Sequence, residues 1–339
     1  MANAYGLYAQ FLTLPEPKGP FTDQIIIVTG SNSGIGLEAA RHYANLDAKK
    51  VILAVRNLES GNEAKKSIEE TTKRSDVVEV WKLDMSSSAS VLEFANKVNK
   101  ELPRLDVAAL NAGVATKLFK ISADGWEETL QVNVISTAYL AILLLPKMYA
   151  TADQFGVTPR LNITASGVHE WAKVTKEMVS DGKLIAWLNK EENAKGKGSY
   201  YEVSKLLEVF FVQELANYIK KRDNGQTKVI VNTIDPGLCH SNLTRNMVQP
   251  GEKIFMTVFK TAFARSTEVG SRTIVNAGEN ENFQTHGKYL ANCVVFPTSD
   301  YVRSKEGYEA QISVWNELRD ILYKLNPDTS RIIDSGTAN

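Results

Sequence analysis

A tyrosine and a lysine lie four residues apart in this chain, Tyr201 and Lys205, within the run Tyr-Glu-Val-Ser-Lys. The residues after them predict a helix over 201–221, and side chains four apart share one face of a helix. An ammonium beside a phenol favours the phenolate, so a tyrosine whose ordinary pKa is about 10 can exchange a proton near neutral pH. The pair therefore predicts an acid–base site, with a surface tyrosine and lysine one turn apart as the alternative.

A glycine-rich loop follows the first predicted strand (residues 24–28) and opens a predicted helix (residues 37–44). The apolar, β-branched run of that strand is typical of burial on both faces of a parallel sheet. Three glycines would allow the sharp turn and a close backbone approach to a pyrophosphate, which the free N–H groups of the helix would bind. The loop predicts dinucleotide binding, and a simple tight turn is the alternative. The expected contacts are Gly30, Ser31, Asn32, Ser33, Gly34, Ile35 and Gly36.

The end of the second predicted strand (residues 50–55) would lie beside the adenosine ribose of such a cofactor. An acidic residue there would bind the ribose hydroxyls, but the sequence continues Val55-Arg56-Asn57. A guanidinium pairs well with a 2′-phosphate, so Arg56 predicts NADP(H) over NAD(H). A solvated arginine at a strand end is the alternative.

Two further strand ends are expected to contact the cofactor. After the predicted strand 77–83, the carboxylate of Asp84 would accept from the adenine amino group, beside the backbone of Met85. After the predicted strand 105–110, the small residues of Asn111-Ala112-Gly113 let the chain pass close to the cofactor, and the Asn111 side chain would tie neighbouring strands.

Two polar residues stand out near the predicted catalytic pair. A predicted helix over 125–149 carries Asn133 in its apolar middle, where a buried amide needs a partner. Asn133 therefore either satisfies a local carbonyl or holds a water in the site. Ser166 follows the fifth predicted strand (residues 160–164), at the edge where α/β sheets place ligands.

The remaining pattern continues the alternation of strands and helices, with a strand over 228–234, a helix over 268–277, a seventh strand around 289–295 and a helix over 306–325. It predicts an α/β fold with a single parallel, doubly wound sheet, in one domain over 1–339. The segments expected outside the core are a lead-in (1–20), an insertion that extends the substrate cleft (168–199), a substrate loop (238–267) and a C-terminal helix and tail (296–339). The helix over 201–221 is apolar nearly all round, so the sheet and either another helix or a second subunit must cover it.

Net charge, cysteine content and the length of the apolar runs limit the classes of partner, site and location that we expect. Lys and Arg number 39 and Asp and Glu number 39, so the zero net charge gives no support for a nucleic-acid partner. Cys239 and Cys293 are too few for a disulfide framework or a structural zinc site, and they suit a reducing compartment. We expect no metal site, no secretory signal and no membrane span, because the longest apolar run (138–145) is short of the roughly 20 residues required. The expected location is cytoplasmic.

These motifs, in this order, resemble the classical short-chain dehydrogenase/reductases over residues 21–295. The matching motifs are Thr-Gly-x-x-x-Gly-x-Gly at 29–36, Asn-Ala-Gly at 111–113, Tyr-x-x-x-Lys at 201–205 and the Pro236-Gly237 turn. The run from Arg160 to His169 is similar to that of retinol-dehydrogenase-like members, a branch that we group here with fungal-type ketoreductases, and this alignment selects Ser166 over Thr164. The resemblance implies a Rossmann-like sheet and an NADP(H)-dependent enzyme.

The resemblance also implies a catalytic tetrad of Asn133, Ser166, Tyr201 and Lys205. Ser166 and Tyr201 would bind a carbonyl oxygen and Tyr201 would supply the proton. Lys205 would lower the tyrosine pKa and bind the nicotinamide ribose, while Asn133 would position a water. Further cofactor contacts implied by the family are Tyr201, Lys205, Pro236, Gly237 and Ser241, where Ser241 replaces a common threonine.

Two departures concern the cofactor and the substrate. The gap from Ser166 to Tyr201 is longer than is usual in the family, and Ser33 stands where many NADP-users carry a cation. Apolar residues in the insertion and in the loop after 238 predict a bulky lipophilic ketone, aldehyde or alcohol as substrate, as in secondary metabolism, with ordinary core as the alternative. A reductase scaffold used for ligand binding or cofactor-assisted non-redox chemistry is the second class of function.

Overall fold

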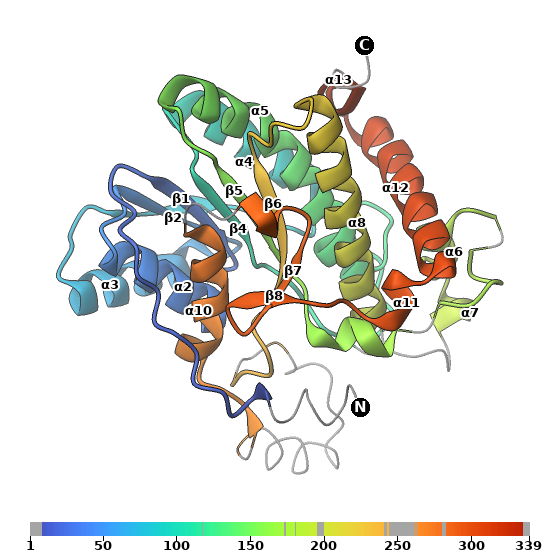
Figure 1. Ribbon diagram of the computed structural model, residues 1–339, viewed down its shortest axis with the longest axis horizontal. Coiled ribbons are helices and arrows are strands. Elements are labelled where there is room, and N and C mark those ends of the chain that lie inside the picture. Colours follow the sequence, from blue (N-terminus) through green and yellow to red (C-terminus); the bar gives the residue numbers. More distant parts are fainter. Residues whose placement is uncertain are drawn as a thin grey trace.

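The computed structural model describes residues 9–116, 118–172, 174–179, 181–194, 200–240, 243, 261, 263–279 and 283–334. Its centre is one eight-stranded sheet in the order β3-β2-β1-β4-β5-β6-β7-β8 (Figure 1). The strands are β1 (Ile25–Thr29), β2 (Lys50–Val55), β3 (Val78–Lys82), β4 (Val107–Leu110), β5 (Arg160–Thr164), β6 (Ile230–Asp235), β7 (Tyr289–Ala291) and β8 (Val294–Phe296). The predicted doubly wound sheet is confirmed. The strand order reverses between β1 and β4, which is where such sheets open a ligand crevice.

Helices cover both faces of the sheet, and two separate apolar clusters fill the two interfaces (Figure 1). One face carries α2 (Gly34–Asn45), α3 (Leu58–Thr72) and α10 (Thr267–Gly278). The other carries α4 (Ser88–Glu101), the π-helix η1 (Leu130–Ser136) with α5 (Thr137–Phe155), and α8 (Tyr200–Arg222). Among the described residues, the other helices are the 3-10 turns η2 (Gly167–Trp171) and η4 (Phe283–Thr285), and α6 (Leu184–Leu188), α7 (Glu191–Ala194), α11 (Asp300–Arg303), α12 (Lys305–Leu325) and α13 (Asp328–Asp334).

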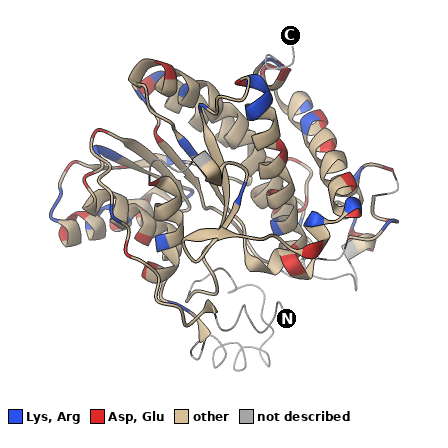
Figure 2. Cartoon of the chain, in the orientation of Figure 1, with Lys and Arg blue, Asp and Glu red and all other residues tan. Residues whose placement is uncertain are grey.

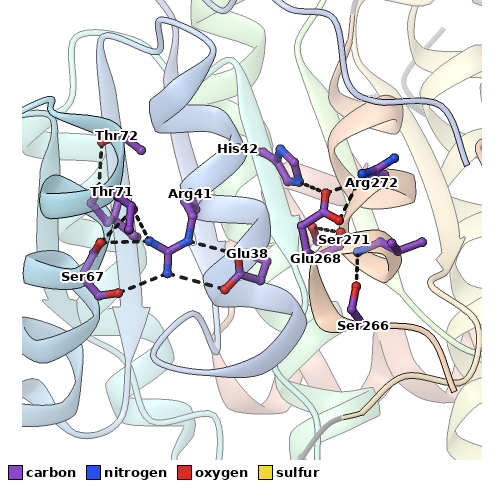
Figure 3. A network of polar contacts seen from close by, with 12 residues as sticks. Glu38, Arg41, His42, Ser67, Thr71, Thr72, Ser266, Glu268, Ser271 and Arg272 are labelled. Carbon is purple, nitrogen blue, oxygen red and sulfur yellow. Dashed lines mark hydrogen bonds and ion pairs between the residues drawn. The ribbon is translucent and has the colours of Figure 1, made fainter.

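Polar contacts hold α2 between its two neighbouring helices (Figure 3). Arg41 of α2 donates to the carbonyl oxygen of Ser67 in α3 (2.9 Å) and also contacts Thr71. On the opposite side, His42 lies 3.0 Å from Glu268 of α10, whose carboxylate also binds Arg272. These partly buried contacts fix the direction of α2, the helix whose N-terminus faces the predicted cofactor site.

Two elements differ from the sequence-based expectation. Where one seventh strand was expected, the structure has a hairpin of two strands, in which β8 runs antiparallel to β7. The turn residues between them, Asn292 and Cys293, have φ of 54° and 63°. That turn requires positive φ at both positions, and Asn-Cys lacks the glycine that usually signals it. The long helix expected from residue 125 begins at Leu130 with one stretch of π-helix, and Gly125 lies in the preceding loop with φ of 85°.

The helix α8 is covered within its own chain. Its outer side packs against α12, where Gln311 donates to Glu214 (2.6 Å) and the rings of Phe211 and Trp315 lie 5.9 Å apart. The sequence allowed either another helix or a second subunit to cover α8. The structure has a helix, α12, in that place, so the apolar surface of α8 does not require a second subunit. Residues Leu130–Phe155 are long and apolar enough to cross a membrane, but most of this segment is buried as a core helix. Figure 2 shows acidic and basic residues interspersed along the outer helices.

Candidate active site

The glycine loop after β1 has the close contacts that a dinucleotide-binding turn requires. Gly30 has φ of 65°, and a Cβ there would lie 2.9 Å from the Cα of Ala112. A Cβ on Gly36 would lie 2.7 Å from the Gly30 carbonyl oxygen and 2.6 Å from the Asn111 amide nitrogen. Only glycine fits at these two positions, and the loop is thereby packed against the 111–113 segment.

Thr29 joins these two segments. Its Oγ1 accepts from the backbone N–H groups of Asn111 and Ala112 (2.9 Å each), while Asn111 Nδ2 donates to the Thr29 carbonyl oxygen (3.1 Å). The strand-tying contact expected of Asn111 is therefore present. Thr29 itself was not expected as a site residue, although a buried threonine directly before the first glycine was the available signal.

The start of α2 fits a pyrophosphate. Its N-cap residue, Ser33, makes no side-chain capping bond, so the first N–H groups of the helix are not satisfied by that side chain. Ser31 is buried and donates to the Val28 carbonyl oxygen (2.8 Å), so it stabilises the loop from within. Asn32 donates to Ser60 (3.3 Å) at the start of α3. Gly34, with φ of 62°, and the half-buried Ile35 complete the turn.

At the adenosine end, Arg56 is exposed directly after β2. The neighbouring Lys82 donates to the Arg56 carbonyl oxygen (2.6 Å), so a second cation lies beside this position. Asp84 uses one carboxylate oxygen to accept from the Ser86 backbone (3.0 Å) and hydroxyl (2.7 Å), and Met85 is buried. Two cationic residues, Arg56 and Lys82, therefore lie together at this end of the sheet.

Three of the four residues expected to be catalytic converge at the carboxyl edge of the sheet. The Ser166 side chain, half-buried after β5, hydrogen-bonds to the buried Tyr201 phenol. Lys205 lies one turn further along α8, with Nζ 5.5 Å from the Tyr201 ring centroid. Lys205 donates to the Thr164 carbonyl oxygen (2.8 Å) and to Glu208. The structure therefore brings the serine, tyrosine and lysine together.

Asn133 lies in the π-helix, and its side chain is fully engaged with the protein. Its amide nitrogen donates to the Val114 carbonyl oxygen and to Ser204 Oγ (2.9 Å each), and its Oδ1 accepts from the Val114 N–H (2.9 Å). Of the two expectations, satisfaction of a local carbonyl is the one observed. A Cβ on Gly113 would lie 3.3 Å from Asn133 Oδ1 and 3.6 Å from Lys205 Nζ, so these two side chains flank Gly113.

Comparison with known proteins decides the family. The family model for short chain dehydrogenases matches residues 24–158. The short chain dehydrogenase/reductase dmxR8 of Cryptosporiopsis sp. (strain 8999) is 44% identical over 324 residues, which cover 95% of this chain and 97% of that protein. The short-chain dehydrogenase/reductase phmF of Phaeosphaeria nodorum is 39% identical, over 96% of this chain and 94% of its own. The chain belongs to the short-chain dehydrogenase/reductase family.

Solved structures of this oxidoreductase family share the fold. The oxidoreductase yciK from E. coli has a TM-score of 0.59 at 22% identity and covers 83% of this chain and 99% of its own. A 3-ketoacyl-(acyl-carrier-protein) reductase from Brucella melitensis, complexed with NADH, has the same TM-score of 0.59 at 16% identity, with 80% and 97% covered. At these identities the likeness concerns the fold alone.

In this short-chain dehydrogenase/reductase, the Tyr201 pKa shifts in the direction opposite to that expected. Burial raises the pKa of Tyr201, the charges of Glu208 and Asp235 raise it further, and the hydrogen bond from Ser166 opposes them. Burial, the largest of these effects, sets the direction, so the lowering expected from Lys205 does not prevail. Burial likewise raises the pKa of Glu208 to about 7, against the lowering effect of Lys205.

The turn after β6 lies beside the same cluster. Gly237 has φ of 76°, and its N–H, after Pro236, donates to Asp235 Oδ1 (2.9 Å). The second oxygen of Asp235 accepts from the Tyr289 hydroxyl (2.9 Å). Ser241, also expected to contact the cofactor, lies outside the described residues.

Sequence reasoning missed two side chains that support the site. Glu208 was detectable as an acid three residues after Lys205 on the same helix. His169 is buried with Nδ1 2.9 Å from the Ser166 carbonyl oxygen, and its Nε2 accepts from the Ser299 N–H (3.2 Å). Burial lowers the pKa of His169, so the neutral ring links the Ser166 turn to the segment before α11.

Proposed function

We propose that this protein is an NADP(H)-dependent oxidoreductase that interconverts a ketone or aldehyde and an alcohol on a bulky lipophilic small molecule. The observation that carries the proposal is the hydrogen-bonded pair of Ser166 and Tyr201, backed by Lys205, at the sheet edge that also holds the glycine loop. Two neighbouring hydroxyl groups can donate hydrogen bonds to a carbonyl oxygen and stabilise the negative charge that develops on it during reduction.

Each side chain has a distinct part in the reaction. NADPH, when bound, supplies the hydride. The hydroxyls of Ser166 and Tyr201 donate to the substrate oxygen, and Tyr201 passes its proton to that oxygen as the carbonyl carbon is reduced. Because burial raises the pKa of Tyr201, the phenol is protonated at neutral pH, as a general acid must be. Lys205 orients the nicotinamide ribose from beside Gly113, and Asn133 holds the Val114 backbone next to that position.

The preference for NADP(H) rests on Arg56. Its exposed guanidinium follows β2, with Lys82 bound to its carbonyl oxygen, and no acidic residue stands at this strand end. A 2′-phosphate would meet two positive charges here and no carboxylate at the strand end to repel it.

The substrate class rests on the segments that border the site. The insertion over 168–199 contains η2, α6 and α7, and it docks on the body through Glu317 of α12, which accepts from the Ile185 and Ala186 N–H groups (2.8 Å each). The loop over 238–267 contributes apolar side chains by sequence, although most of it lies outside the described residues. A lipophilic substrate of secondary metabolism, handled by a single-domain cytoplasmic enzyme, fits these features.

The test is Tyr201→Phe. Without its proton donor, the variant should retain NADPH binding, followed by nicotinamide fluorescence, while NADPH consumption with a panel of lipophilic ketones falls by about two orders of magnitude or more. The matched control is Tyr200→Phe, since the Tyr200 hydroxyl donates to the Leu188 carbonyl oxygen (2.8 Å) in the insertion. Unchanged turnover in Tyr201→Phe would exclude Tyr201 as the acid. A wild-type protein that binds NADPH but oxidises it with no carbonyl compound would favour the binding or non-redox function.

A further inference from the structure

The chain before β1 runs along α10, and we call its residues 9–18 the N-terminal strap (Figure 1). At one end of the strap, the Lys18 N–H donates to Glu279, directly after α10 (2.6 Å). Further back, the Leu14 carbonyl oxygen accepts from Arg272 of α10 (2.8 Å). Leu14 is also buried, so the strap is packed against the body of the protein.

The beginning of the strap is bound by Arg265, two residues before α10. This side chain is 6% exposed, and its Nη2 donates to the Ala9 carbonyl oxygen and to Asn292 Oδ1 (2.7 Å), while its Nε donates to the Gln10 carbonyl oxygen (3.4 Å). A Cβ on Gly237 would lie 3.0 Å from Arg265 Nη1. The guanidinium therefore lies between the strap and the turn after β6 (residues 235–238).

The side chain of Gln10 contacts this turn directly. Its Oε1 accepts from the Leu238 N–H (3.2 Å), and a Cβ on Gly237 would lie 3.1 Å from its Nε2. Gly237 has φ of 76°, a conformation that favours glycine. The strap thus supplies the acceptor for a backbone donor of the turn, and this bond fixes the orientation of the Leu238 peptide.

On its other side, the turn borders the candidate catalytic pair. A Cβ on Gly167, the residue after Ser166, would lie 3.0 Å from Asp235 Oδ2, and the charge of Asp235 acts on Tyr201. Under the proposed function, Ser166 and Tyr201 hold the carbonyl group that is reduced, so the groups beside them are those that meet the nicotinamide half of NADPH. The turn belongs to that half of the site, whereas Arg56 lies at the adenosine half.

We propose that Gln10 is a positioning residue of the reductase site: together with Arg265, its side chain holds the turn after β6 in the shape that receives the nicotinamide half of NADPH. The inference rests on the proposed function for the identity of the ligand. It deepens that function by giving the chain before β1 a part in the site, through contacts that join residues more than 220 positions apart, such as the bond from Leu238 to Gln10 (228 positions).

The first test is backbone amide hydrogen exchange at Leu238 in the protein without ligands. Gln10→Ala removes the acceptor, so exchange at Leu238 should become about fivefold faster, the factor that the loss of one hydrogen bond implies. Gln10→Glu keeps an acceptor oxygen at the same place and should exchange like the wild type. The matched control on the strap is Glu16→Gln, which alters a side chain that is 83% exposed and should leave Leu238 unchanged.

The second test compares two ligands by calorimetry, NADPH and 2′-phospho-ADP-ribose, which lacks the nicotinamide. Gln10→Ala should weaken NADPH binding by about fivefold and leave the binding of 2′-phospho-ADP-ribose unchanged, because only the nicotinamide half meets the turn. Gln10→Glu should restore NADPH binding. In ketone reduction by Gln10→Ala, kcat should fall while the KM for the ketone stays the same.

The exchange measurement needs no ligand, so it separates this inference from the proposed function. Unchanged exchange at Leu238 in Gln10→Ala would overturn the inference. Faster exchange with both ligands weakened equally, or with neither weakened, would show a merely structural contact and overturn it as well. A protein that shows the expected exchange and binding but oxidises NADPH with no ketone would support the role of Gln10 and overturn the reductase.

Two outcomes in the wild-type protein are also decisive. If the wild type binds neither ligand, both the reductase and the role of Gln10 are overturned. If Gln10→Ala does not fold, wild-type exchange decides, because a Leu238 amide that exchanges as fast as an unprotected one contradicts the proposed bond and a protected one supports it.

Discussion

Replacing Asn133 by alanine removes three hydrogen bonds from the centre of the molecule. The side chain is fully buried and bonds to both backbone groups of Val114 and to Ser204, which lies 71 residues further along the chain. A hydrogen bond contributes about 1 kcal/mol net, so Asn133→Ala should lower the free energy of unfolding by about 3 kcal/mol. Since Val114 directly follows the Asn111–Gly113 segment, NADPH should also bind more weakly.

The assay is urea denaturation followed by circular dichroism, combined with NADPH titration by fluorescence. The matched control is Asn99→Ala on α4, because the half-buried Asn99 donates a single bond to the Leu143 carbonyl oxygen (3.2 Å) and should cost only about 1 kcal/mol. A loss of less than about 0.5 kcal/mol in Asn133→Ala would refute the reasoning from these contacts. If turnover fell while stability and NADPH affinity stayed unchanged, the water-holding role expected from the family would be the better account of Asn133.

Two further predictions concern the cofactor and pH. Arg56→Ala should weaken NADPH binding by about tenfold, because one charge-assisted contact is lost, and should leave NADH binding unchanged. Both affinities are measured by fluorescence titration. If the wild-type protein bound NADPH and NADH equally well, Arg56 would not have the role given to it. Burial lowers the pKa of His169 and of His286 in the folded protein, so the stability they contribute is complete above about pH 6.5 and is lost as pH falls through the folded pKa. Urea midpoints between pH 7.5 and 5 should therefore fall less steeply in His286→Gln than in the wild type, and parallel curves would contradict this.

The order of elements and the location of the site could be predicted from the sequence because both depend on local patterns. Continuous β-branched runs and helical spacing identified the strands β1 to β6 and the helices α2, α3, α4, α5 and α8, with bounds that shifted by a few residues. Tyr201 and Lys205 share a helix face because the helical repeat alone brings them together. The glycines at 30 and 36 are explained by close backbone contacts that the loop itself imposes once strand and helix are recognised.

The cover of α8, the hairpin at the sheet edge and the partners of Asn133 were decided only in three dimensions. The contacts of α8 with α12 and of Asn133 with Ser204 join segments far apart in the chain, which no local period encodes. The hairpin is local, but its Asn-Cys turn lacks the glycine that would have signalled it.

The acid–base properties of the site were also decided only by the tertiary structure. The sequence supplies a phenol and an ammonium one turn apart, and by itself that spacing predicts a lowered tyrosine pKa. Burial and the charges of Glu208 and Asp235 reverse the direction. Residue types and spacing determined which groups meet in the site. The tertiary structure decided the direction of each pKa shift, because a pKa depends on desolvation and on every charge nearby.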